Sequence, residues 1–117
     1  DKRGRQMVKA IWNGKVIAES NDIVEVEGNA YFPLSSIHRD YFKDSSTHTT
    51  CPWKGRASYF VIDVDGNVNR DAAWTYPTPL PGAEAVTDRV AFWRTPVLSD
   101  LAALDVVTCL LLRTFLA

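Results

Sequence analysis

Three turn signals constrain this chain more than any other feature, because they divide it into segments that must fold back on their neighbours. Asn13-Gly14, Gly28-Asn29 and Asp65-Gly66 each separate two runs in which apolar and polar residues alternate. An Asn-Gly or Asp-Gly pair favours a two-residue hairpin, in which both central residues take a positive φ. The chain is therefore predicted to be mainly β, with compact antiparallel sheets.

Alternation between the turns gives the bounds of the expected strands. They are 8–12, 15–19, 23–27, 30–32, 57–64, 68–76 and 89–93. Short helical turns are expected over 37–42, which Ser35 or Ser36 can cap, and over 83–87. Residues 43–55 are expected to form a loop, since Pro52 and Gly55 interrupt regular structure there.

One domain is expected over residues 1–117, because this length is typical of a single domain and no linker or internal repeat is visible. With 13 basic and 14 acidic residues, the net charge of −1 gives no support for a nucleic-acid partner. Cys51 lies beside a proline and Cys109 in an apolar run, and two such cysteines favour reduced thiols in a cytoplasmic protein. No secretory signal and no CxxC pair are visible, so neither export nor a metal or other cofactor is expected.

The C-terminal segment, residues 96–117, differs from the rest in being rich in Leu, Ala and Val. From residue 98 its apolar positions recur at helical spacing, which predicts a C-terminal helix. Asp105 and Arg113 within it argue against a membrane span. The helix is expected to pack on the sheet or on a second subunit, which makes a homodimer one hypothesis.

Six blocks of sequence, spread over about residues 8–93, indicate most clearly which family the chain resembles. They are Lys9-Ala10-Ile11-Trp12-Asn13-Gly14-Lys15-Val16-Ile17-Ala18-Glu19-Ser20, Val26-Glu27-Gly28-Asn29, Tyr31-Phe32-Pro33, Thr47-His48-Thr49-Thr50-Cys51-Pro52-Trp53-Lys54-Gly55, Asp71-Ala72-Ala73-Trp74-Thr75-Tyr76-Pro77 and Val90-Ala91-Phe92. Together they closely resemble "domain of unknown function 427", a small family of bacteria and fungi with a nucleotidyltransferase-like label.

The resemblance implies a fold similar to the β-tent, or Mss4-like, architecture, and it implies no established reaction. Two departures are visible. Zinc-binding β-tent proteins use paired cysteines, which this chain lacks, and the apolar segment from Pro96 has no recognised counterpart.

The most reactive side chains are crowded between Thr47 and Gly55. Cys51 is a candidate nucleophile, because His48 or Lys54 near it could stabilise a thiolate, although most free cysteines simply pack. His48 is a candidate general base or a tether for the segment. Lys54 is a candidate for binding an anionic group, or else a solvated side chain.

Asp71 and the aromatic residues complete the candidate site. Asp71 could pair with a cation, contact a ligand or act as a base. Trp53, Tyr59 and Trp74 are expected to line the site, because aromatic walls dominate small-molecule pockets.

Three functions are left open by the sequence. The first is binding of a small anionic or aromatic ligand in a pocket lined by Cys51, Trp53, Lys54, Tyr59, Asp71 and Trp74, with His48 shaping it. The second is an enzyme of nucleotidyltransferase-like or thiol-dependent type that uses Cys51 or Asp71. The third is a structural module that dimerises through its C-terminal helix. Neither a nucleic acid nor a membrane is expected as a partner.

Overall fold

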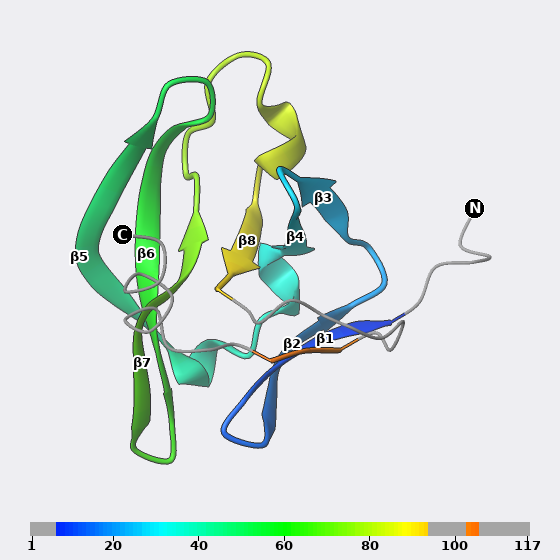
Figure 1. Cartoon of the computed structure of the whole chain (residues 1–117), viewed down its shortest axis with the longest axis vertical. Helices are drawn as coiled ribbons and strands as arrows, with labels where there is room; N and C mark the ends of the chain where they lie inside the picture. The colour runs from blue at the N-terminus through cyan, green and yellow to red at the C-terminus, as the bar shows by residue number, and fades with distance from the viewer. Residues whose placement is uncertain (1–6, 94–102, 106–117) are drawn as a thin grey trace.

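Two β-sheets of unequal size form the described part of the chain (Figure 1). The structure is a computed structural model, and it describes residues 7–93 and 103–105. Within these residues the smaller sheet has the order β2 (Lys15–Ser20), β1 (Val8–Trp12) and β9 (Ala103–Asp105). The larger sheet has the order β3 (Val24–Val26), β4 (Asn29–Pro33), β8 (Arg89–Phe92), β7 (Asn67–Thr75), β6 (Gly55–Val64) and β5 (Phe42–Cys51). The mainly β, mostly antiparallel fold is confirmed, whereas the finer expectation of a β-tent architecture stays a prediction.

Two of the turn signals form hairpins as expected. Asn13 and Gly14 have φ values of 51° and 77°, and Asp65 and Gly66 have values of 54° and 84°. These positive values are the ones that a type I′ turn requires, and they match the right-handed twist of the strands. The two hairpin tips also contact each other, because the Asn13 side chain donates a 3.1 Å hydrogen bond to a carbonyl at the end of β6.

The second turn lies one residue earlier than the sequence predicts. Val26 pairs with Asn29, so Glu27 and Gly28 form the two-residue loop. Glu27 has a φ of 56°, although a glutamate has no local preference for this region. Its side chain is held by contacts across the fold that are described below.

The expectation of a loop over residues 43–55 is wrong. Residues up to Cys51 belong to β5, which pairs with β6 from Phe42 opposite Ile62 to Cys51 opposite Gly55. The run is rich in Thr and Ser, and the β-branched threonines suit an extended backbone. The loop reduces to a tight turn around Trp53.

Three short 3-10 helices connect the strands. These are η1 (Leu34–Ser36), η2 (Arg39–Tyr41) and η3 (Glu84–Val86). The helical turn expected over 37–42 is reduced to η2, and neither Ser35 nor Ser36 caps it, because both serines belong to η1. The Ser36 hydroxyl donates instead to the Pro33 carbonyl, and Ile37, which follows, is buried in the core. The turn expected over 83–87 is confirmed as η3.

The expected C-terminal helix is not supported. Ala103–Asp105 forms β9, which runs parallel to β1 along its free edge. The rest of the predicted helix, 98–102 and 106–117, lies outside the described residues. In the described part of the chain no helix has the length and apolar character that crossing a membrane requires.

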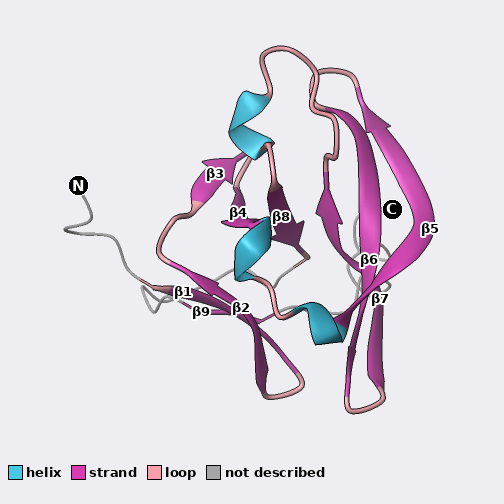
Figure 2. Ribbon diagram, turned by 180° about the vertical axis from the view of Figure 1, so that it is seen from behind, coloured by secondary structure: helices cyan, strands magenta, loops and turns pink. Residues whose placement is uncertain are grey.

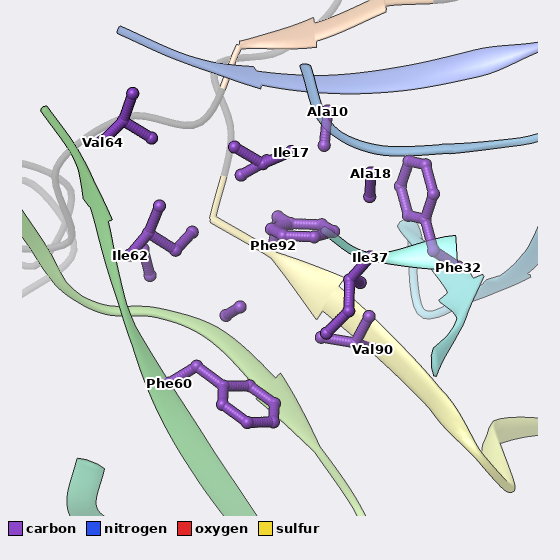
Figure 3. Close-up of a cluster of buried hydrophobic side chains, with 12 residues drawn as sticks. Ala10, Ile17, Ala18, Phe32, Ile37, Phe60, Ile62, Val64, Val90 and Phe92 are labelled. Carbon is purple, nitrogen blue, oxygen red and sulfur yellow. The ribbon is translucent and has the colours of Figure 1, made fainter. Parts of the chain in front are cut away.

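The principal core lies between the two sheets (Figure 3). β1 and β9 run across the direction of β6 in both views, so the smaller sheet covers one face of the larger one (Figures 1 and 2). The residues in this core include Ala10, Ile17, Ala18, Phe32, Ile37, Phe60, Ile62, Val64, Val90 and Phe92.

A second cluster covers the opposite face of the larger sheet. It consists of Tyr31, Ala57, Trp74, Tyr76, Ala83, Val86 and Ala91. Neighbouring residues on one strand alternate between the two clusters, as Tyr31 and Phe32 do on β4. β4, β8 and the second half of β7 are therefore buried on both faces, whereas β5 and part of β6 carry exposed polar groups.

Candidate functional site

A cavity of about 500 Å³ opens where β5, β6 and the end of β7 face η1, η2 and the turn before β8. It is lined by Leu34, Arg39, Asp44, Ser45, His48, Ser58, Tyr59, Phe60, Thr75, Tyr76, Pro77 and Asp88. The lining combines the Phe60 ring with residues that bear hydroxyl, imidazole, guanidinium and carboxylate groups, the mixture that small-molecule sites use.

Alternation along β6 decides which side chains face this cavity. Ser58 and Phe60 lie on the cavity side, whereas Ala57 points into the second cluster on the opposite face. Phe60 is almost fully buried and its ring lies beneath the guanidinium of Arg39, whose central carbon is 5.9 Å from the ring centroid. This cation–π contact orients the Arg39 side chain along the cavity.

Arg39 is exposed on η2, and its side chain ends in a guanidinium cation. Among the described residues, no carboxylate lies within ion-pair distance of its guanidinium. Its planar array of N–H donors is therefore available to an anion from solvent.

His48 lies on β5 directly opposite Ser58 on β6. Its Nδ1 is 3.2 Å from the carbonyl oxygen of Ala57 and 3.3 Å from the Ser58 hydroxyl. When Nδ1 carries the proton it donates to the carbonyl, and Nε2 is then an acceptor; when the ring is protonated, Nε2 becomes a donor. Nε2 can thus accept a hydrogen bond from a ligand or, in the protonated ring, donate one to an anion.

Two further hollows adjoin the cavity. One, of about 600 Å³, shares Leu34, Arg39 and Asp88 with it and continues past Ser35, Thr87 and Arg89. The other, of about 230 Å³, shares His48, Ser58 and Pro77 and continues past Arg56 and Thr78. We refer to the hollow that includes Ser35 and Thr87 as the outer cavity.

Asp71 stands in a wide β-bulge of β7 and has a φ of 54°. Residues 69–73 of β7 oppose the shorter stretch 60–62 of β6, and residues 44–48 of β5 oppose the shorter stretch 58–60. The Asp71 carboxylate joins the two bulges, because it accepts hydrogen bonds of 2.5 Å from the Ser45 hydroxyl and 2.8 Å from the Thr47 hydroxyl. Asp tolerates the left-handed region better than most residues, and bulges commonly redirect side chains near sites.

Lys54 is buried and forms an ion pair with Glu27, which lies in the β3–β4 turn. Its Nζ also lies 5.5 Å from the ring centroid of Trp53 and 5.2 Å from that of Tyr76. Trp53 Nε1 donates a 3.2 Å hydrogen bond to the same Glu27 carboxylate. The ammonium is therefore already neutralised within the fold.

These contacts shift the pKa values of the group. Burial disfavours the Lys54 ammonium, but its hydrogen bond to Glu27 and the nearby acidic groups outweigh burial and raise the pKa of Lys54. The hydrogen bonds from Lys54 and then Trp53 lower the pKa of Glu27. Burial raises the pKa of the Tyr76 hydroxyl despite the adjacent ammonium.

Trp74 lies in the second cluster, where aromatic rings fill the space around it. Its ring contacts Trp93 at a centroid distance of 5.5 Å and Tyr59 at 6.3 Å, and its Nε1 donates a 3.2 Å hydrogen bond to the Tyr31 hydroxyl. Cys51 is partly buried against the same cluster. This region is packed as a core.

The seven residues singled out from the sequence thus do not line one cavity. His48 and Tyr59 line the 500 Å³ cavity, although the Tyr59 ring packs beside Trp74 in the second cluster. Asp71 contacts the cavity wall through Ser45. Lys54, Trp53, Cys51 and Trp74 lie with the second cluster on the other face of the sheet or at its edge. Their roles as ligand contacts or as catalytic groups stay predictions.

The polar lining residues that sequence reasoning missed are Arg39, Asp44, Ser45, Ser58, Thr75 and Asp88. They come from several elements, and no local pattern marks them as neighbours. In the described part of the chain, no group of three His, Cys, Asp or Glu side chains could hold a metal ion.

A mainly β domain with a polar, aromatic-floored cavity on one sheet face is the class of protein that this geometry defines. The chain belongs to the family described as "Domain of unknown function (DUF427)", whose family model, labelled NTP_transf_9, matches residues 2–103. This confirms the resemblance seen in the sequence blocks. No curated protein matches the chain.

Proposed function

We propose that this protein binds a small anionic ligand in the 500 Å³ cavity, with Arg39 and His48 as the groups that receive the negative charge. The observation that carries the proposal is the guanidinium of Arg39, which is held over Phe60 and lines the cavity without a carboxylate partner among the described residues. A guanidinium in such a position offers two parallel hydrogen bonds to a carboxylate or phosphate.

The floor of the cavity favours a ligand with a flat apolar part. Phe60 supplies the ring, because Tyr59 and Tyr76 direct their rings to the second cluster on the opposite face. Ser45, Ser58 and Thr75 supply polar atoms around it. The Thr75 hydroxyl is already donated to the Arg89 carbonyl at 2.7 Å, so Ser58 and the imidazole beside it are the more available partners. An anion attached to an aromatic ring would satisfy both parts of the lining.

Lys54 is a weaker candidate for the anion-binding group than Arg39. Its ammonium is buried, paired with Glu27 and covered by the rings of Trp53 and Tyr76. A ligand anion at that position would have to displace the Glu27 carboxylate and would lose the free energy of that contact.

The hypothesis of a thiol-dependent enzyme finds less support. Cys51 packs against the second cluster, while His48 directs Nδ1 to Ala57 and Ser58, and Lys54 directs its ammonium to Glu27. A thiol reaction would need one of these bases to contact the sulfur. Dimerisation through the C-terminal segment, a β-tent likeness and a cytoplasmic location stay predictions.

Benzoate is a suitable first probe because it joins one negative charge to one ring, and benzamide is its neutral control. Binding can be followed by changes in the NMR spectrum of the protein. We expect the wild-type chain to bind benzoate more tightly than benzamide. Arg39→Gln should weaken benzoate binding by about tenfold, and Arg39→Lys should restore only part of the loss, since an ammonium lacks the planar fork.

The control variant is Lys15→Gln, which removes an exposed cation from the smaller sheet. It should leave the affinity unchanged. Equal affinity for benzoate and benzamide, or equal losses in Arg39→Gln and Lys15→Gln, would refute the proposal.

A further inference from the structure

We propose that the natural ligand is a phosphodiester with one substituent in the 500 Å³ cavity and the other in the outer cavity. This inference rests on the proposed function and names the ligand class of the same site. Its geometric basis is that Arg39, Leu34 and Asp88 line both hollows, so the guanidinium stands at their boundary and not at the end of either one.

The position of the cation determines where the anion lies in the ligand. A carboxylate or a phosphate monoester ends the molecule that bears it, so a ligand of that kind would fill only one of the two hollows. A cation between two hollows suits an anionic group that has a substituent on each side. A phosphodiester has that connectivity, and its two unesterified oxygens match the two parallel donors of a guanidinium.

The charges at the boundary also favour a diester over a monoester. Arg89, the other cation that lines the outer cavity, forms an ion pair with Asp22. Its Nη2 lies 3.2 Å from both carboxylate oxygens, and its Nη1 donates a 2.8 Å hydrogen bond to the Asp22 carbonyl. Arg39 therefore supplies the available positive charge there, and Asp88, an acidic residue, lines the same boundary. A diester carries one negative charge at neutral pH, whereas a monoester carries close to two.

The two hollows offer different surroundings to the two substituents. The inner one has the ring of Phe60, against which a flat group can lie. The outer one has the hydroxyl-bearing side chains of Ser35 and Thr87, both exposed, beside Pro33 and Leu34. We therefore expect an aromatic substituent on one side of the phosphate and a more polar substituent on the other.

Asp88 allows the sign of the ligand's charge to be tested. Its carboxylate repels any anion placed at Arg39, so Asp88→Asn should bind a diester as tightly as the wild type or more tightly. A cationic ligand would show the reverse pattern, with binding lost in Asp88→Asn and retained in Arg39→Gln.

The test compares bis(nitrophenyl) phosphate with nitrophenyl phosphate by calorimetric titration of the full chain. The diester should bind at least about tenfold more tightly than the monoester. Ser35→Trp places an indole in the outer cavity and should reduce the affinity for the diester to that for the monoester. Ala85→Trp, which adds an exposed indole on η3, should leave both affinities unchanged.

The outcomes separate the two proposals. Equal binding of diester and monoester, or a diester affinity that Ser35→Trp does not change, would overturn the inference while leaving an anion site at Arg39. Binding of neither phosphate, together with no binding of benzoate, would overturn the proposed function as well.

Discussion

The Ser45 hydroxyl donates a 2.5 Å hydrogen bond to the carboxylate of Asp71, although the two residues lie on strands that are separated by β6. Thr47 donates to the other carboxylate oxygen at 2.8 Å. The carboxylate therefore fixes the bulge of β5, the strand that brings Ser45 and His48 to the cavity. A residue in an uncommon backbone conformation thus maintains the shape of the candidate site.

Replacing Asp71 should separate the contribution of its side chain from that of its backbone. Asp71→Ala loses the charged acceptor of the hydrogen bonds from Ser45 and Thr47 and keeps a Cβ at positive φ, so the free energy of unfolding should fall by about 2–4 kcal/mol. Asp71→Gly loses the same hydrogen bonds but tolerates the backbone, and should be more stable than the alanine variant by about 1 kcal/mol. Urea denaturation measures both, and equal stability of the two variants would contradict strain at this position.

Lys54 should prove to be a stabilising residue. Lys54→Met keeps most of the side-chain volume but leaves the Glu27 carboxylate without its cation. Removing one partner of a fully buried ion pair costs about 3–5 kcal/mol, and about 1–3 kcal/mol is expected here because the Glu27 side chain is 48% exposed to solvent. The affinity for benzoate should not change. If Lys54→Met instead lost affinity for benzoate and still unfolded at the same urea concentration as the wild type, Lys54 would be a ligand-binding residue and not a stabilising one.

The same ion pair should make stability depend on acid. The pKa of Glu27 is lower in the folded protein than its ordinary value of 4.5, so the carboxylate contributes stability above that value. This contribution is lost as the pH falls through the folded pKa. Between pH values of about 7 and 3, unfolding free energies should therefore fall more in the wild type than in Glu27→Gln. An equal fall in the free energy of unfolding of the two proteins would show that the Glu27–Lys54 pair does not contribute to stability.

Cys51 should react as an ordinary thiol. It packs against the second cluster, and neither His48 nor Lys54 directs its hydrogen bonds to the sulfur. In a Cys109→Ser background, the rate of alkylation by iodoacetamide should be no greater than that of a short peptide containing cysteine. Labelling that is much faster than in the peptide would instead support the thiol-dependent enzyme.

Local chemistry allowed much of the fold to be predicted. Asn13-Gly14 and Asp65-Gly66 form the expected hairpins because both residues of each pair accept positive φ at little cost. The second hairpin was displaced by one residue because the distant contacts of Glu27 with Lys54 and Trp53 stabilise a turn that its own sequence does not favour.

The candidate site was less predictable because tertiary pairing assembles it. Arg39 from a 3-10 helix, His48 from β5 and Asp88 from a turn become neighbours only after β5 and β8 take their places in the larger sheet. The segment around Lys54 looked like a ligand site because it concentrates reactive and aromatic groups. Those groups instead pair or pack with one another, and the candidate anion-binding charge is on Arg39, which no local pattern marks.

A crystal structure of the protein with bromobenzoate tests the central claim most directly, because the anomalous signal of bromine locates the ligand without reference to a variant. We expect the bromine peak over Phe60 in the 500 Å³ cavity, with the carboxylate against the Arg39 guanidinium. A peak beside Trp53 and Lys54, with the cavity beneath Arg39 occupied by water alone, would contradict the account.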